Sequence, residues 1–206
     1  MPSIDKIMTA CPVIPVIVID DIEDAIPLAQ ALVNGGLKVL EITLRTEQGL
    51  EAIRRIKQAV PEAIVGAGTV LTAEDISAAV AAGSAFLVSP GCTAALIDAA
   101  QQQQVPLLPG IASPSEAMVL LEKGVCHMKF FPAEAAGGVA MLKSIAGPLP
   151  QIKFCPTGGI TEAIAPNYLA LKNVLCVGGS WMVDKVLLAE KDWAAIEAKA
   201  RAAAQL

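Results

Sequence analysis

The repeated alternation of strand-like and helix-like segments limits the possible folds more than any other feature of this chain. Eight short apolar segments are predicted to be β-strands, and each is followed by residues with the spacing of an amphipathic helix. The predicted strands cover residues 13–18, 39–43, 64–66, 86–89, 107–108, 127–131, 152–155 and 174–177, after a short amphipathic helix near residues 3–9. Eight unbroken units indicate an α/β fold, a (β/α)8 TIM barrel that occupies residues 1–206 as a single domain, with an open doubly wound sheet as the alternative.

Residues at the ends of the predicted helices support the same alternation. Gly36, Gly83 and Gly124 each follow a helical stretch and are predicted C-terminal caps. Thr72 is a predicted N-cap, and residues 113–116 combine a capping box with proline at the first helical position. The predicted helices therefore begin and end where the alternating pattern requires.

Composition excludes several classes of function. The net charge is −5 and there are only four arginines, so a nucleic-acid-binding surface is not expected. A single histidine, without a cluster of acidic residues, predicts no metal site. The longest apolar run, near residues 12–19, is too short to span a bilayer, and the amino terminus does not resemble a secretory signal. Five cysteines without a CxxC pair indicate a reducing compartment, so we expect a cytoplasmic protein.

Lys129 points most directly to chemistry. It lies in an apolar run, residues 125–132, that is predicted to be a buried strand closed by proline. Because burial disfavours a charged ammonium, a free amine would be populated and could attack a ketone to form a Schiff base. The alternative is a lysine whose stem lies on apolar neighbours while its nitrogen reaches water. Phe131 and His127 should share the face of Lys129, Phe131 as an apolar wall and His127 as a buried, hydrogen-bonded side chain.

Polar residues on the second predicted strand form a second part of the expected site. Glu41, Thr43 and Arg45 alternate with apolar residues and should face the barrel interior, near the strand ends where barrel enzymes place their functional groups. An ordinary ion pair at a strand edge is the alternative. After the third strand, the small residues around Gly68 should let a ligand approach the backbone, and Thr69 offers a hydroxyl.

Two glycine pairs follow the last two predicted strands. Gly158–Gly159 and Gly178–Gly179 stand where barrel enzymes frequently bind phosphate through backbone N–H groups. Either pair alone is typical of a tight turn. Together, at corresponding places on neighbouring strands, they predict a phosphorylated ligand.

These motifs resemble a known family, the class I 2-keto-3-deoxy-6-phosphogluconate (KDPG) aldolases, which also include 4-hydroxy-2-oxoglutarate aldolase activity. The resemblance covers nearly the whole chain and rests on EITLRT at 41–46, VGAGTV at 65–70, SPG at 89–91, KFFPAE at 129–134, FCPTGGI at 154–160 and VGGSW at 177–181. It implies a (β/α)8 barrel, usually a homotrimer, that uses no metal or organic cofactor. It also implies a pyruvate-forming aldehyde-lyase that cleaves KDPG to pyruvate and glyceraldehyde 3-phosphate, with 4-hydroxy-2-oxoglutarate as a further substrate.

The resemblance also implies roles for individual residues. Lys129 would be the Schiff-base lysine and Glu41 the proton shuttle. The substrate would be held by a further set, namely Arg45 and Thr69 at its carboxylate, Pro90 and Phe131 at the pocket wall, and Gly158, Gly159 and Ser180 at its phosphate. Residue types alone leave two other functions open: a phosphosugar isomerase that uses the carboxylate as a base without an imine, and a non-catalytic barrel that binds a phosphorylated metabolite. They also do not decide between KDPG, its galactonate epimer and 4-hydroxy-2-oxoglutarate.

Overall fold

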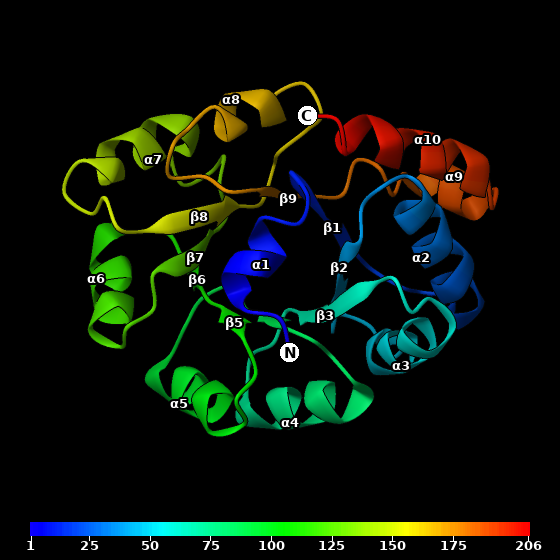
Figure 1. The fold of residues 1–206 in the computed structure, drawn as a ribbon, viewed down its shortest axis with the longest axis horizontal. Coiled ribbons are helices and arrows are strands. Elements are labelled where there is room, and N and C mark those ends of the chain that lie inside the picture. Colours follow the sequence, from blue (N-terminus) through cyan, green and yellow to red (C-terminus); the bar gives the residue numbers. More distant parts are fainter.

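Parallel strands curl around a common axis, and the larger helices lie outside them (Figure 1). The computed structural model describes all 206 residues. One sheet has the spatial order β5 (Leu107–Leu108), β4 (Leu87–Val88), β3 (Ile64–Gly68), β2 (Val39–Thr43), β1 (Val13–Ile17) and β9 (Val177–Gly179). A second sheet contains β6 (Gly110–Ile111), β7 (His127–Phe130) and β8 (Lys153–Pro156). The predicted α/β class, with a curled parallel sheet, is confirmed.

The two sheets meet at two junctions. Only Pro109, which has no backbone N–H to donate, separates β5 from β6. At the other junction, isolated parallel bridges join Phe154 to Val174 and Thr157 to Gly178. These bridges are three residues apart on one chain segment (154 to 157) and four on the other (174 to 178), so one extra residue interrupts the ladder, as in a β-bulge. The last strand therefore begins at Val177, and its prediction at residues 174–177 is wrong in extent.

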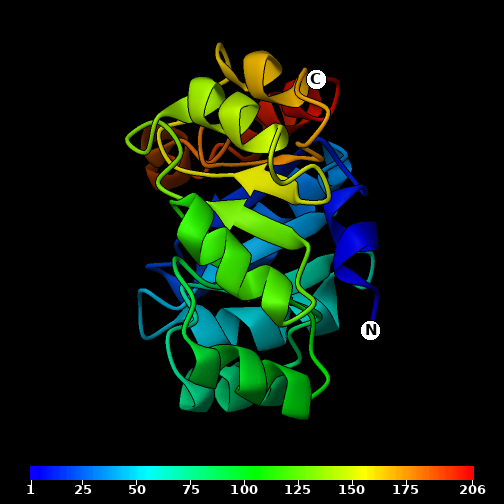
Figure 2. The same cartoon turned by 90° about the vertical axis from the view of Figure 1, so that its left-hand side faces the viewer.

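Helices follow the strands and cover the outer face of the sheets, as the side view in Figure 2 shows. They are η1 (Ile22–Asp24), α2 (Ala25–Asn34), α3 (Gly49–Ala59), α4 (Ala73–Ala82), α5 (Ala94–Gln102), α6 (Pro114–Glu122), α7 (Gly138–Ala146), α8 (Ala165–Leu169), α9 (Lys185–Ala189) and α10 (Trp193–Ala203). Gly83 is the C-cap of α4, as predicted, with a φ angle of 99°. Gly36 and Gly124, with φ angles of 100° and 76°, each lie one residue beyond the cap, which is Gly35 for α2 and Lys123 for α6. The predicted N-cap at Thr72 and the predicted capping box at Ser113 are also present, and Thr72 forms a capping box of its own with Asp75. None of the helices is long and apolar enough to cross a lipid bilayer.

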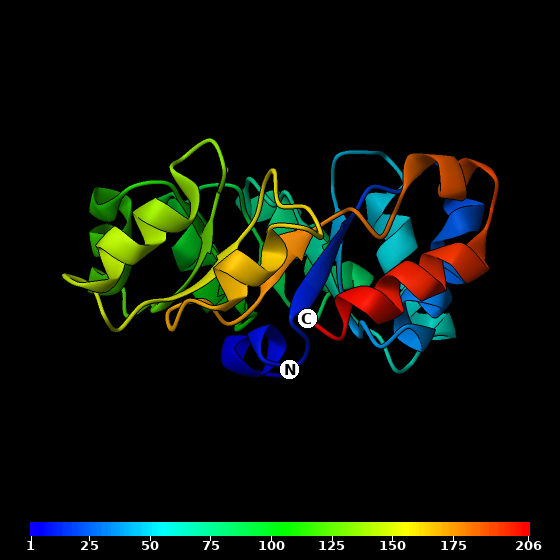
Figure 3. The same ribbon diagram turned by 90° about the horizontal axis from the view of Figure 1, so that it is seen from above.

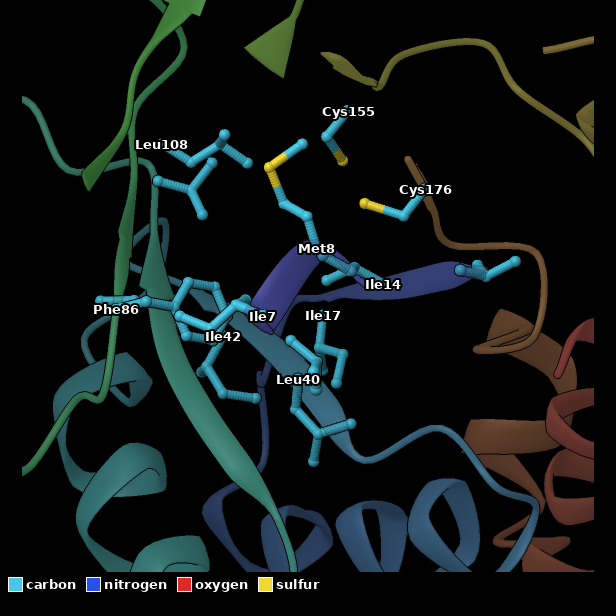
Figure 4. Packing of buried hydrophobic residues seen from close by; sticks show 14 of the residues in the cluster. Ile7, Met8, Ile14, Ile17, Leu40, Ile42, Phe86, Leu108, Cys155 and Cys176 are labelled. Atoms are coloured by element: carbon cyan, nitrogen blue, oxygen red, sulfur yellow. The ribbon is translucent and has the colours of Figure 1, made fainter. Parts of the chain in front are cut away.

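A short helix, α1 (Ile4–Met8), closes one end of the curled sheets (Figures 1 and 3). Its side chains Ile7 and Met8 are fully buried and lie among residues of the strands, such as Ile14 and Leu108 (Figure 4). Burial of each such side chain stabilises the fold by about 1.5–3 kcal/mol. The opposite end, where the strands finish, is left for a binding site.

His127 lies at the closed end, at the start of β7. Its Nε2 is 3.2 Å from Oδ1 of Asp5 in α1, so the predicted hydrogen-bonded histidine is confirmed. The prediction that it is buried is wrong, because 23% of its side chain is exposed. His127 is the first residue of β7, and its partner Asp5 is itself 61% exposed, so the pair lies at the surface.

Candidate active site

A buried ion pair between Lys129 and Glu41 forms the centre of the site. Nζ of Lys129 in β7 lies 3.3 Å from Oε1 of Glu41 in β2, and each side chain is only 5% exposed. The lysine side chain is therefore almost completely buried, which contradicts the alternative of an exposed lysine head. Two charges removed from water at this depth require each other, because desolvation of an unpaired ion is costly.

Strand pairing and a neighbouring glycine define the position of each side chain. Lys129 is paired with Gly110 on one side and with Cys155 on the other. Glu41 is paired with Gly66 of β3 and points over Gly68, where a Cβ atom would come within 2.3 Å of Oε1. Gly68 thus makes room for the carboxylate, rather than only for a ligand as its sequence suggests. The position of Glu41 therefore depends on the absence of a side chain at Gly68.

The surroundings of Lys129 are otherwise uncharged. Its Nζ is 5.2 Å from the centre of the Phe131 ring, which confirms that both side chains share a face. Glu41 is the one acid in contact with the lysine. A proton moved across their hydrogen bond converts the ion pair into a neutral amine and a carboxylic acid, which requires no solvent.

Arg45 and Thr69 lie together just beyond the ends of β2 and β3. Nε of Arg45 donates a hydrogen bond of 3.3 Å to the Thr69 hydroxyl. Thr69 has a φ angle of 59°, which is unfavourable for a β-branched residue and costs about 1–3 kcal/mol. Such backbone strain is typical of functional sites, where the surrounding structure imposes it. The guanidinium keeps free N–H groups that can bind a carboxylate.

A cavity of about 530 Å³ opens at the end of the strands opposite α1. Five predicted site residues line it: Arg45, Phe131, Gly158, Gly159 and Ser180. Gly158 and Gly159 have φ angles of 106° and 78°, in the left-handed region that glycine tolerates. The second glycine pair, Gly178–Gly179, lines the same cavity. Both pairs thus contribute backbone to one wall, as the sequence predicts.

Seven further residues that the sequence analysis did not predict also line the cavity. They are Val16, Val18, Asp20, Ile160, Val183, Lys185 and Leu188. Val16 and Val18 could have been found from the period of two along β1, since Val16 is the register partner of Glu41. Asp20 and Lys185 follow no such period, because they lie outside the strands.

Lys129, Glu41 and Thr69 do not line the cavity themselves, but Lys129 and Thr69 contact the lining residues Phe131 and Arg45. Thr43 and Pro90 also lie outside the lining. Thr43 is fully buried and its hydroxyl donates a hydrogen bond of 3.0 Å to the Ile17 carbonyl, so it serves the packing of β1 and β2. Pro90 is absent from the cavity lining, and its carbonyl packs closely on Gly110, the strand partner of Lys129. Pro90 as a pocket-wall residue stays a prediction.

Comparison with known proteins gives one consistent family. The family described as "KDPG and KHG aldolase" matches residues 4–199. A 2-dehydro-3-deoxy-phosphogluconate aldolase of Dickeya dadantii is 54% identical over 98% of this chain and 94% of its own length. A KDPG aldolase of Legionella pneumophila, solved with pyruvate captured as a covalent carbinolamine, has a TM-score of 0.95 at 48% identity and 97% coverage of both chains. The Zymomonas mobilis KDPG aldolase, solved with 3-phosphoglycerate, has a TM-score of 0.93 at 52% identity and covers 97% of this chain and 94% of its own.

Proposed function

Because the chain belongs to the KDPG and KHG aldolase family, we propose that it is a class I aldolase that cleaves KDPG to pyruvate and glyceraldehyde 3-phosphate. The observation that carries this proposal is the buried Lys129–Glu41 pair, whose neighbour Phe131 lines the cavity with the glycine pairs. Pyruvate and 3-phosphoglycerate, which related enzymes bind, resemble the two ends of such a substrate.

The first half of the reaction joins Lys129 to the substrate. Glu41 takes a proton from the lysine over their 3.3 Å contact, and the free amine attacks the C2 carbonyl carbon to give a carbinolamine. Glu41 then returns the proton to the C2 hydroxyl, which leaves as water while the nitrogen lone pair forms the iminium. Because the pair is buried, separated charges would be costly, and transfer of the proton to give a neutral amine and a neutral carboxylic acid is favoured.

The second half breaks the C3–C4 bond. Glu41, again a carboxylate, accepts the proton of the C4 hydroxyl as the aldehyde forms, and the electrons of the C3–C4 bond move into the iminium to give an enamine. Glu41, which faces Lys129, is the group placed to protonate C3. Addition of water to the resulting iminium releases pyruvate and restores the free lysine.

The remaining predicted residues hold the two ends of the substrate. Arg45 binds the carboxylate with two parallel N–H groups and Thr69 adds its hydroxyl, which brings the ketone beside the amine. Gly158, Gly159 and Ser180 bind the phosphate with backbone N–H and hydroxyl donors. Phe131 and Pro90 form the pocket wall beside the ketone end of the substrate. We also propose 4-hydroxy-2-oxoglutarate as a slower substrate, because it shares that end but has no phosphate.

We further propose that the two sheets form one closed (β/α)8 barrel and that residues 1–206 are a single domain. Two features support closure: only Pro109 separates β5 from β6, and two bridges join residues 154 and 157, in and just after β8, to residues 174 and 178, before and in β9. The family resemblance supports a cytoplasmic homotrimer that works without metal or organic cofactor. Light scattering of the purified protein at several concentrations tests the trimer, and a monomer mass would contradict it.

Reductive trapping tests the function. Borohydride added with pyruvate should modify Lys129, as peptide mass spectrometry would locate, and Lys129→Ala should abolish both the adduct and the cleavage of KDPG. The matched control is Lys153→Ala, because Lys153 lies on the neighbouring strand with its Nζ bonded to the Lys172 carbonyl and not to the site. An enzyme that interconverts phosphosugar isomers and resists borohydride would instead be an isomerase.

A further inference from the structure

Glu134 ends the KFFPAE segment and has no role in the chemistry proposed above. We propose that Glu134 and Tyr168 form a clamp that positions the Gly158–Gly159 loop for binding of the substrate phosphate. This proposal rests on the proposed function. Neither side chain is expected to touch the reacting carbons, so both would be positioning residues.

Backbone contacts first tie the segment after β7 to the glycine loop. The N–H of Ala133 donates to the Thr157 carbonyl at 2.8 Å, and the N–H of Glu134 donates to the Gly158 carbonyl at 3.1 Å. A Cβ atom on Gly159 would lie only 2.9 Å from Cβ and Cγ of Glu134, so the Glu134 stem backs this glycine directly. The direction of the loop's N–H groups therefore depends on where Glu134 is held.

The side chain of Glu134 is held from the other side by Tyr168. The Tyr168 hydroxyl donates a hydrogen bond to Oε1 of Glu134, and no other partner of that hydroxyl is present. Tyr168 is 1% exposed, and burial, followed by the hydrogen bond to Glu134, raises the pKa of its hydroxyl, so it remains a donor. Tyr168 belongs to α8, the helix that follows the glycine loop. Glu134 thus contacts the glycine loop through its backbone and stem, and contacts α8, the helix after that loop, through its carboxylate.

Charge explains why this connection matters for phosphate. The Glu134 carboxylate is next to a loop proposed to bind a dianion, and a free carboxylate that rotated toward Gly159 would repel it. The hydrogen bond from Tyr168 keeps the carboxylate directed away from the cavity, which it does not line. Loss of the bond should weaken binding of the phosphate and leave the Lys129–Glu41 pair intact.

Kinetics with and without the phosphate test the clamp. Tyr168→Phe should raise KM for KDPG about tenfold with kcat within about threefold, because it frees the carboxylate, and this is the size expected for one lost hydrogen bond of ordinary strength. Glu134→Ala should have a similar effect for another reason, because it removes the part of the stem that backs Gly159. Both should leave kcat/KM unchanged, within about twofold, for 2-keto-3-deoxygluconate, the same acid without phosphate. Glu134→Gln should stay close to the unsubstituted enzyme, because its amide oxygen can still accept from Tyr168.

A matched control separates positioning from general stability. Asn173→Ala also removes a buried hydrogen bond, from Nδ2 to the Leu142 carbonyl in α7, but it has no contact with the glycine loop. It should lower the melting temperature without changing KM for KDPG. Equal losses on both substrates, or an unchanged KM in Glu134→Ala, would refute the clamp. Absence of KDPG cleavage by the unsubstituted enzyme would instead refute the proposed function.

Discussion

Replacement of Gly68 by alanine should separate the catalytic carboxylate from its lysine while the fold is kept. The added Cβ would lie 2.3 Å from Oε1, 2.6 Å from Cγ and 2.8 Å from Cδ of Glu41. Gly68 has no left-handed φ angle, so the alanine backbone is not strained. The three nearest atoms all belong to the Glu41 side chain and none to the backbone, so Glu41 should move and the strand should stay.

The expected loss of activity follows from these distances. Ordinary contact begins near 3.4 Å, so Oε1 has to move by at least 3.4 − 2.3 = 1.1 Å from the methyl group. The Lys129–Glu41 contact is 3.3 Å, and a further 1 Å takes it outside hydrogen-bond range. A displacement of about 1 Å at a reacting group can cost about 10²-fold in rate, so kcat for KDPG cleavage should fall about 100-fold.

The assay follows pyruvate release in a coupled dehydrogenase reaction, together with the melting temperature. Gly91→Ala is the matched control, because a Cβ at this position meets nothing within 4 Å, and its kcat should be unchanged. Lys129 should still be trapped by borohydride in Gly68→Ala, only more slowly, since the nucleophile itself is retained. A Gly68→Ala enzyme that keeps more than half of its kcat would show that the position of Glu41 is not needed for proton transfer.

Three further predictions concern separate parts of the molecule. Hydrogen bonds to the Glu116 carboxylate, first from the Ala112 N–H and then from Ser113, hold the pKa of Glu116 below its ordinary value, although burial opposes them. The carboxylate therefore stabilises the folded state fully above about pH 4.3, the pKa in the unfolded chain. This stabilisation is lost as the pH falls through the lower pKa of the folded state. Glu116→Gln should therefore lower the free energy of unfolding at pH 7 by about 1 kcal/mol or less, since the group is exposed. Thermal melts at several pH values should show a lower melting temperature at pH 7 and no difference in acid. Burial raises the pKa of Cys92 from 9.0 to about 11, so iodoacetamide at pH 8 should alkylate it about 100-fold more slowly in the folded than in the denatured chain; equal rates would contradict this. Ser180→Asp places a carboxylate on the cavity wall, and steady-state kinetics should give at least a tenfold higher KM for KDPG with little change for 2-keto-3-deoxygluconate.

The parts of the fold that follow a regular period could be predicted from the sequence. The strand at residues 39–43 has the predicted bounds, because apolar and polar residues alternate there and turn residues flank the segment. The same alternation predicts that Glu41 faces the interior, and the apolar run around Lys129 predicts its burial. Helix ends were predictable wherever glycine or a capping box marked them.

Features that depend on contacts between distant segments could not be predicted in this way. The extra residue before β9 becomes visible only when the segment is paired with β8. The exposed charges of Asp20, in a loop, and Lys185, the first residue of α9, show no pattern in the sequence that marks them as cavity residues. The hydrogen bond between Glu134 and Tyr168 joins residues 34 positions apart, and no local pattern indicates such a pair.

The closure of one end by α1 also bears on how the protein can be immobilised or fused to a partner. Both chain termini lie on the side of that helix, away from the ends of the strands where the cavity opens (Figure 3). A bead, a resin or a fused partner joined at either terminus would leave the entrance facing the medium, so diffusion of small molecules into an immobilised preparation would be unhindered.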